Sequence, residues 1–414
     1  MNKLIVIPIL ALILVSIDLY VFQAIKTITQ DWSVSNKKIA HSLYWGFTAI
    51  LMVGLFTYHF VDPERVGRSA RTFIMVGIFM IYLSKIIAFL FVFIDDIIRF
   101  FTWVANKLSG SQPEGMTNGV TRSEFLAKAG LALASVPFLG MSYGIIFGAH
   151  DYRIRRKKVY LPNLPESFNG LRIAQISDIH AGSFFNKRAV ARGVKMIMEQ
   201  AADLIFFTGD LVNNRASEVE NYKSLFSRLS APLGVFSVLG NHDYGDYIRW
   251  ESDEAKAKNL ADLKKAHGEM GWRLLLNEHE LIEKNGEQLA IIGVENWGAG
   301  GFVKHGDLDK AYKGAEKAPV KLLLSHDPSH WTHHVQKTDI DITFSGHTHG
   351  MQFGIEVAGI KWSPVKYRYK QWAGLYKEAN QYLYVNRGFG YLGFPGRVGM
   401  PPEITILELH KGDA

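Results

Sequence analysis

Five short clusters of Asp, Asn and His occur after residue 170, and each directly follows a short apolar run. Their donor atoms are carboxylate oxygens, an amide oxygen and imidazole nitrogens, a mixture that suits Mn²⁺, Fe or Zn²⁺ better than Ca²⁺. The chain has no Cys, which excludes thiolate metal sites, disulfides and a cysteine nucleophile. The clusters are Ser177-Asp178-Ile179-His180, Gly209-Asp210, Gly240-Asn241-His242-Asp243, Ser325-His326-Asp327 and Gly346-His347-Thr348-His349.

The spacing within the clusters predicts that their side chains converge. Asp178 and His180 are two positions apart, so both fall on one face of an extended strand end, and His347 and His349 are spaced in the same way. A glycine begins three of the clusters and allows a tight turn that brings the backbone close to an ion. One Asp-x-His pair alone usually lies in a solvated turn, whereas five clusters in this order favour a single metal site.

A site that holds two such metal ions is suited to the hydrolysis of a phosphoester. A phosphoester resists attack because it is anionic and because water is a poor nucleophile. Two cations ~3.5–4 Å apart neutralise the phosphoryl oxygens and lower the pKa of a shared water, so that hydroxide exists near neutral pH. A protonated imidazole can then donate a proton to the departing oxygen.

The order of the clusters resembles that of the calcineurin-like metallophosphoesterases, whose pattern is Asp-x-His, Gly-Asp, Gly-Asn-His-Asp, a later His and Gly-His-x-His. The resemblance covers about Leu171 to Leu409. The closing stretches Tyr384–Gly388 and Pro401–Ile404 are similar to a bacterial membrane-associated branch of phosphodiesterases within that family. The resemblance implies a layered α/β/β/α sandwich with a binuclear metal centre.

Carried over position by position, the resemblance implies two metal sites and one catalytic imidazole. One divalent ion would be held by Asp178, His180, Asp210 and His349. Asp210 would bridge to a second ion, which would also be held by Asn241, His326 and His347. His242 would be the catalytic imidazole that binds no metal, and Asp243 would orient it.

The sequence departs from the family pattern at two places. Asn213 and Asn214 follow Val212, where many relatives carry an acidic residue, and Met351 follows Gly350, where a second Gly is common. Neither departure changes an implied ligand, so both concern the groups that orient the ligands and the shape of the loops.

The clusters need buried strands to position them, and short apolar runs with β-branched residues supply these. The predicted strands are Leu171–Ser177, Leu204–Thr208, Val235–Leu239, Val320–Leu324 and Ile340–Ser345. Helical patterns lie between them at Lys187–Ala202, Ala255–Met270 and Pro328–Gln336. Strands that alternate with helices predict an α/β fold. Later runs suggest a second sheet packed on the first, and they are Gln288–Val294, Gln381–Asn386 and Glu403–Leu409.

The N-terminal part of the chain is predicted to lie in lipid. Four apolar stretches approach the ~20 residues needed to cross a hydrocarbon core, at about Leu4–Ile25, Leu43–Val61, Thr72–Ile94 and Phe125–Ala149. We therefore expect transmembrane helices in residues 1–150 and the metallophosphoesterase domain in residues 151–414. With the resemblance, this predicts a multi-pass protein of a bacterial plasma (inner) membrane.

Two features of the apolar stretches have a role other than insertion into the membrane. Asp18 and Lys85 are ionisable groups inside two stretches, and they either pair across the bundle or each reach an interface. Gly140, Gly144 and Gly148 repeat every four residues in the last stretch, which lets another helix approach its backbone closely.

The charge distribution does not determine on which side of the membrane the catalytic domain lies. A net charge of +7 fits an anionic membrane surface as well as nucleic acid. The distribution of Lys and Arg favours a cytoplasmic catalytic domain. Against this, the stretch 121–126 resembles a twin-arginine export signal that lacks one arginine, which would place the domain outside.

Weaker signals surround the predicted site. The Gly-rich segment Trp297–Gly306 is a candidate for a loop over the cleft, and the basic, aromatic stretch Trp362–Tyr376 is a candidate rim for lipid headgroups or an anionic substrate. Arg387 and Arg397 are candidates for phosphate contacts or ordinary surface arginines.

The predicted function is that of a membrane-anchored phosphoesterase with two divalent metals, acting on phosphomonoesters or phosphodiesters. Tethering makes lipid-linked or envelope substrates a hypothesis, with membrane lipids as partners. One alternative is a scaffold that kept the fold and lost catalysis, although no ligand or catalytic His is missing. The other is a membrane-bound nuclease, which the positive charge favours, although we expect no specific nucleic acid partner.

Overall fold

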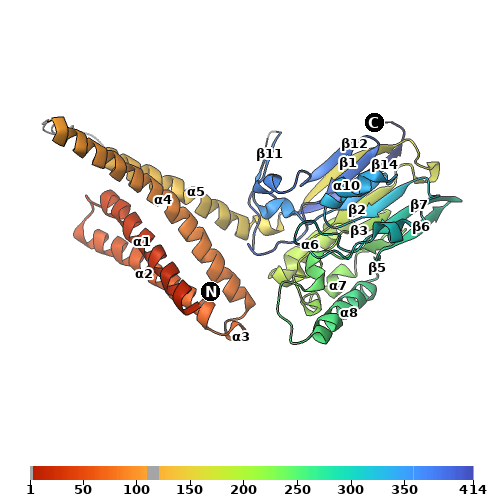
Figure 1. Ribbon diagram of the computed structural model, residues 1–414, viewed down its shortest axis with the longest axis horizontal. Helices are drawn as coiled ribbons and strands as arrows, with labels where there is room; N and C mark the ends of the chain where they lie inside the picture. The colour runs from red at the N-terminus through yellow and green to blue at the C-terminus, as the bar shows by residue number, and fades with distance from the viewer. Residues whose placement is uncertain (1–2, 110–120, 358, 414) are drawn as a thin grey trace. The chain divides into compact units, whose positions relative to one another are not determined.

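The structure, a computed structural model, describes residues 3–109, 121–357 and 359–413 (Figure 1). The chain divides into two compact units, Met1–Tyr143 and Gly144–Ala414, called here the N-terminal and the C-terminal unit. The predicted fold class, apolar helices followed by a layered α/β domain, is confirmed.

The N-terminal unit is helical. Its helices are α1 (Lys3–Ile28), α2 (Val34–Phe60), α3 (Pro63–Val66), α4 (Arg68–Ser109) and α5 (Arg122–Ile146), of which α5 ends in the C-terminal unit. Within the described residues, four helical segments are long and apolar enough to cross a membrane, as predicted: Lys3–Ile28, Val34–Phe60, Ser69–Ser109 and Arg122–His150. The predicted span Thr72–Ile94 is only the apolar part of α4, which has 42 residues.

A buried polar cluster joins three of these helices. The carboxylate of Asp18, on α1, is fully buried. It accepts hydrogen bonds from the Thr48 hydroxyl at 3.0 Å and from the Tyr82 hydroxyl at 2.6 Å, and it forms an ion pair with Lys85 on α4. Tyr44 of α2 donates a further bond, at 3.1 Å. The predicted pairing of Asp18 with Lys85 is therefore confirmed.

We expect Lys85→Met to destabilise the protein by about 3–5 kcal/mol, because it leaves a buried carboxylate without its cation. The double variant Asp18→Leu/Lys85→Met should be less destabilised than Lys85→Met alone, since it removes both charges. Thermal unfolding of the full chain in nanodiscs measures both effects. Equal losses in the single and double variants would show that the charges do not stabilise each other.

The C-terminal unit contains two six-stranded sheets, seen with their covering helices in Figure 1. The first sheet has the order β1 (Arg153–Leu161), β14 (Glu403–Lys411), β2 (Arg172–Ile176), β3 (Leu204–Phe207), β4 (Val235–Ser237), β5 (Arg273–Leu274). The second has the order β12 (Gly374–Glu378), β13 (Gln381–Val385), β9 (Ile342–Ser345), β8 (Lys321–Leu324), β7 (Glu287–Gly293), β6 (Glu278–Lys284).

The two sheets pack face to face through apolar side chains. Phe206 of β3 and Phe344 of β9 meet edge to face with ring centroids 5.0 Å apart, inside a hydrophobic cluster drawn from both sheets. The outer face of the first sheet buries apolar residues of α6 (Lys187–Met198) and α8 (Asp253–Glu269). Residues of α9 (Leu308–Tyr312) and α10 (Ser329–His333) cover the outer face of the second. This gives four layers, α/β/β/α.

Two details differ from the sequence prediction. The strands predicted at Val320–Leu324 and Ile340–Ser345 belong to the second sheet, whereas the strand predicted at Glu403–Leu409 lies in the first. The helix predicted at Pro328–Gln336 is only the single turn α10, because the backbone of His334 leaves the helical region at φ −134°.

A two-stranded ribbon, β10 (Ile355–Val357) and β11 (Ile360–Trp362), lies outside both sheets. Figure 1 shows it projecting from the C-terminal unit.

Candidate metal centre

The predicted ligands come from the carboxyl ends of five strands in two sheets. In the first sheet β2, β3 and β4 run parallel, and in the second β8 runs parallel to β9, so each set of strands ends at one edge. Gln175 joins the two edges, because its amide donates to the carbonyl oxygen of Ser345 at 2.9 Å. The clusters that follow the strands therefore meet between the sheets, where ligands of α/β sheets are expected.

The backbone at these ends is unusual. Five of the seven predicted ligands have positive φ, at 49–70°, although none is glycine: Asp178, His180, Asp210, His347 and His349. Left-handed backbone costs energy for such residues, and it gathers at functional sites. Glycines allow the close approach, since a Cβ on Gly240 would lie 2.3 Å from a carboxylate oxygen of Asp210.

One group of donors consists of Asp178, His180 and His349, whose donor atoms all lie within 4.8 Å of one another. The Nε2 atoms of the two histidines are 3.1 Å apart. Asp178 Oδ1 lies 3.2 Å from His349 Nε2, and all three side chains are buried.

A second group consists of Asp210, His326 and His347, again with donor atoms within 4.8 Å of one another. Asn241 joins it, because its Oδ1 lies 2.8 Å from His347 Nδ1. Asp210 connects the two groups, since its Oδ2 lies 3.2 Å from His326 Nε2 and 3.5 Å from His180 Nε2. All seven predicted ligands thus come together, with Asp210 in the bridging position.

The hydrogen bonds around the histidines fit a cation between them. His180 Nδ1 lies 3.0 Å from the side-chain oxygen of Asn213, and His326 Nδ1 lies 2.7 Å from the carbonyl oxygen of Thr208. Each Nδ1 therefore donates a hydrogen bond, and Nε2 faces Asp210. Nitrogen atoms and a carboxylate oxygen at these distances repel one another unless a proton or a metal ion lies between them.

The electrostatics of the metal-free centre lead to the same conclusion. Burial alone would lower the pKa of His326, but the neighbouring carboxylate of Asp210 outweighs it and raises that pKa to about 10. At His326 the carboxylate therefore favours a positive charge, whereas burial lowers the pKa of His180 and of His347. A divalent ion can supply the positive charge beside Asp210 instead of a proton.

His242 lies beside the ligands but is held differently. Its ring is partly exposed, and its centroid lies 5.0 Å from that of His180. Its Nδ1 lies 2.9 Å from the carbonyl oxygen of Asn213, so Nδ1–H donates and Nε2 is free to exchange a proton. His242 Nε2 is therefore available to a group bound at the centre, and its catalytic role stays a prediction.

The role implied for Asp243 is wrong. Its carboxylate accepts hydrogen bonds from backbone N–H groups, at 2.9 Å from Gly240 and Asp210 and at 2.8 Å from Leu211. Burial, together with the nearby charge of Asp210, raises the pKa of Asp243 to about 7. Asp243 therefore ties the loop after β4 to the loop after β3, and the carbonyl of Asn213 orients His242.

Asn213 is the functional residue that the sequence prediction missed. Its side chain orients His180 and its carbonyl orients His242, so it links one ligand with the free imidazole. The departure from the family pattern after Val212 marks this position in the sequence.

Two segments flagged in the sequence reach the centre. The hydroxyl of Tyr369, in the basic aromatic stretch, lies 2.7 Å from His347 Nε2. The ring of Phe302, in the Gly-rich loop, meets the ring of His347 edge to face at 4.9 Å. Both segments therefore form walls of the site.

The phosphate contacts considered for the two arginines are wrong. Arg387 is 2% exposed and pairs with Glu403 and Glu356. Arg397 is also 2% exposed, and its guanidinium donates to the carbonyl oxygen of Gly390 at 2.6 Å. Both guanidinium groups therefore bond within the protein and stabilise the fold around the ligands.

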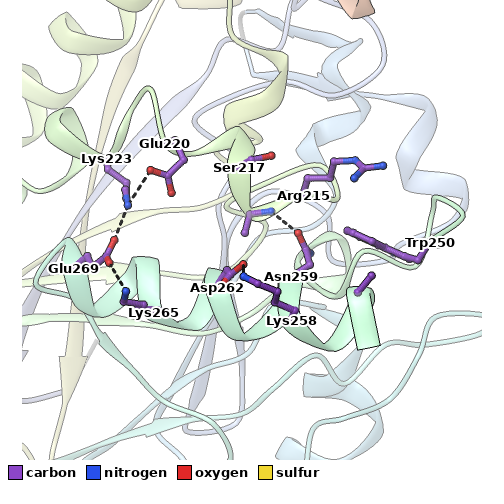
Figure 2. A pocket seen from close by; sticks show the side chains of 12 residues that line it. Arg215, Ser217, Glu220, Lys223, Trp250, Lys258, Asn259, Asp262, Lys265 and Glu269 are labelled. Atoms are coloured by element: carbon purple, nitrogen blue, oxygen red, sulfur yellow. Dashed lines mark hydrogen bonds and ion pairs between the residues drawn. The ribbon is translucent and has the colours of Figure 1, made fainter. Parts of the chain in front are cut away.

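A cavity of 510 Å³ lies beside α8, apart from the predicted ligands (Figure 2). Most of its charged side chains pair with one another, with Lys223 3.0 Å from Glu220 and Lys258 2.6 Å from Asp262. Arg215 instead lies over the ring of Trp250, with its guanidinium carbon 4.9 Å from the ring centroid.

Comparisons with known proteins agree with this geometry. Residues 2–149 match a family model described as "probable calcineurin-like phosphoesterase, transmembrane domain", and residues 171–351 match the calcineurin-like phosphoesterase model. The UDP-2,3-diacylglucosamine pyrophosphatase LpxG of Chlamydia trachomatis is 30% identical over 297 residues, which cover 59% of this chain and 86% of that protein. The chain belongs to the calcineurin-like metallophosphoesterase family.

Relatives of this metallophosphoesterase occur in animals and bacteria. A transmembrane protein with metallophosphoesterase domain from Danio rerio is 28% identical over 371 residues, covering 86% of this chain and 76% of that protein. The metallophosphoesterase YkuE of Bacillus subtilis is 26% identical over 276 residues, covering 65% of this chain and 90% of that protein. The metallophosphoesterase is thus an integral membrane member of a family that uses divalent metals.

We expect His242→Ala to retain bound metal but to lose roughly 10²–10⁴-fold in turnover, because it removes a proton donor and no ligand. Asp210→Ala should lose both metal and turnover. Elemental analysis and hydrolysis of bis(p-nitrophenyl) phosphate measure the two properties. The matched control is His333→Ala, an exposed histidine outside the centre, which should change neither. Loss of metal from His242→Ala would show that His242 is a ligand.

We expect Asn213→Ala to raise the Mn²⁺ concentration for half-maximal activity by roughly 10–100-fold, because His180 loses the acceptor that orients it. Turnover at saturating Mn²⁺ should change little, since the backbone carbonyl that orients His242 remains. Asn213→Asp is the control, because it keeps an oxygen acceptor for His180. An unchanged Mn²⁺ dependence in the alanine variant would exclude this role.

Proposed function

We propose that the chain is a membrane-anchored phosphoesterase with two divalent metal ions that hydrolyses a lipid-linked phosphoester or diphosphate. The observation that carries this proposal is the convergence of seven ligand-type side chains and one free imidazole in a chain with four candidate membrane spans. We further propose that residues 1–150 anchor it in a bacterial inner membrane and that residues 151–414 form the catalytic domain.

The residues of the centre divide into two sites that share Asp210. One divalent ion would be held by Asp178, His180, Asp210 and His349. The other would be held by Asp210, Asn241, His326 and His347. When bound, such a pair neutralises the phosphoryl oxygens and supplies hydroxide near neutral pH.

The remaining groups position the substrate and move the proton. His242, held at Nδ1 by the carbonyl of Asn213, donates a proton from Nε2 to the departing oxygen. Asp243 keeps the loops that carry Asp210 and Asn241 in register through its four backbone hydrogen bonds. Tyr369 and Phe302 form walls of the site beside His347.

Two observations support a lipid-linked substrate. The anchor holds the enzyme where such substrates lie. One relative is named for the hydrolysis of UDP-2,3-diacylglucosamine, a diphosphate joined to a lipid-bearing sugar. A scaffold without activity is disfavoured, because every implied ligand and His242 are present and close together.

The test is hydrolysis by the purified full chain with Mn²⁺ in nanodiscs, against UDP-2,3-diacylglucosamine, phospholipids, bis(p-nitrophenyl) phosphate and p-nitrophenyl phosphate. We expect turnover of the soluble aryl esters and a higher kcat/KM for a lipid-linked compound, both abolished in Asp210→Asn. A protein that retains two metals and hydrolyses none of them would contradict the enzymatic proposal. Strong competition by DNA or RNA would instead indicate a nuclease.

A further inference from the structure

The β10–β11 ribbon has its polar and apolar faces reversed with respect to an ordinary surface hairpin. Ile355 pairs with Trp362 and Val357 with Ile360, and paired residues two apart along a strand share one face. These four side chains are 53%, 37%, 67% and 65% exposed, respectively. One face of the ribbon is therefore apolar and open.

The opposite face is charged, and its charged groups bond to the rest of the protein, although Lys361 is partly open to solvent. It carries Glu356 and Lys361, which pair across the ribbon. Glu356 forms ion pairs with Arg155 at 2.5 Å and with Arg387 at 3.0 Å, and Lys361 donates to the carbonyl oxygen of Ala373. These bonds fix which face points outward, so the exposure of the apolar face is set by the fold.

The ribbon starts beside the point where the last candidate membrane span ends. Gly144 and Gly148, near the end of that span, pack on the backbone of Arg397, where a Cβ on Gly148 would lie 2.1 Å from the carbonyl oxygen. The next residue, Val398, bridges to Phe353, two residues before β10 begins. The glycine repeat thus accommodates a loop of the C-terminal unit, where the sequence predicted a second helix.

The neighbouring side chains have the composition of a membrane interface. Ile146 and Phe147, at the end of α5, are 68% and 60% exposed. The segment after β11 exposes Lys366, Tyr367 and Arg368. Apolar and aromatic side chains beside Lys and Arg are typical of surfaces that enter the headgroup region, whereas an apolar face this open is uncommon on a soluble surface.

We propose that the apolar face of the β10–β11 ribbon inserts into the lipid interface of the membrane that holds the chain. The ribbon would then present the metal centre to phosphoesters lying in the plane of the membrane, a consequence that rests on the proposed function. The centre is close along the chain, because His349 lies six residues before Ile355. After the ribbon, Ser363 bonds to the carbonyl oxygen of Gly350 at 2.8 Å.

The absence of Cys from the chain allows a direct test of the contact. Ile360→Cys in the full chain, labelled with the environment-sensitive dye NBD and placed in nanodiscs, should show blue-shifted emission that spin-labelled phosphatidylcholine quenches. The matched control is Glu283→Cys on β6, an exposed position of another hairpin in the same unit, whose label should not be quenched. Equal quenching at the two positions, or none at Ile360, would overturn the proposal.

A second copy of the chain is the competing occupant of the apolar face. Energy transfer between Ile360 labels on two copies, without quenching by spin-labelled lipid, would assign the face to self-association and overturn the lipid contact. Separate nanodiscs that hold one copy each should therefore give the same quenching as crowded ones.

The consequence for the substrate is tested with Val357→Glu/Ile360→Glu. We expect kcat/KM for a lipid-linked substrate to fall by about tenfold or more, since two apolar side chains no longer enter lipid. Hydrolysis of bis(p-nitrophenyl) phosphate should stay unchanged, because neither residue belongs to the metal centre. Equal loss on both substrates would contradict the role in substrate capture. If the wild-type protein is inactive on every substrate while the label in Ile360→Cys is quenched, only the proposed function is contradicted.

Discussion

The C-terminal unit depends on one electrostatic constraint, the crowding of carboxylates and imidazole lone pairs in a buried space between two sheets. Asp210 Oδ2 lies 3.2 Å from Nε2 of His326 and 3.5 Å from Nε2 of His180. Unlike water, the protein interior screens such charges poorly. The arrangement is therefore stable only with protons or cations among these atoms, and the chemistry of the donors suits two divalent ions that share Asp210.

The residues that form this crowded centre adopt locally unfavourable backbone conformations. Five ligand-type residues adopt positive φ, and each is held by the rigid strand that precedes it. The carboxylate of Asp243 accepts hydrogen bonds from four backbone N–H groups. These bonds hold the loops after β3 and β4 together. Asn213 orients two imidazole rings. Its side chain accepts a hydrogen bond from His180, and its backbone carbonyl accepts one from His242. These groups preorganise the centre without touching a substrate.

In both units, charged side chains form their bonds within the protein. In the N-terminal unit Asp18 is buried with four donors, so the charge is neutralised among the helices. In the β10–β11 ribbon the charged residues Glu356 and Lys361 also face the protein, and the apolar residues face outward. Both arrangements are unfavourable beside water and favourable beside lipid, which is the environment that the four candidate spans require.

Residue types and short spacings determined the donor chemistry, the order of the clusters, the strands before them and the apolar spans. These properties are local, because an Asp-x-His pair after an apolar run can be recognised from a few consecutive residues. The pairing of Asp18 with Lys85 could be stated as a hypothesis, because unpaired charges are costly in lipid. Only the tertiary structure decided which strands share a sheet, that Asp243 binds backbone instead of His242, and that Arg387 and Arg397 are internal. It also showed that Asn213 reaches His180, 33 positions away, and which face of the ribbon is open. These contacts depend on how distant strands and loops pack, and no local pattern encodes that packing.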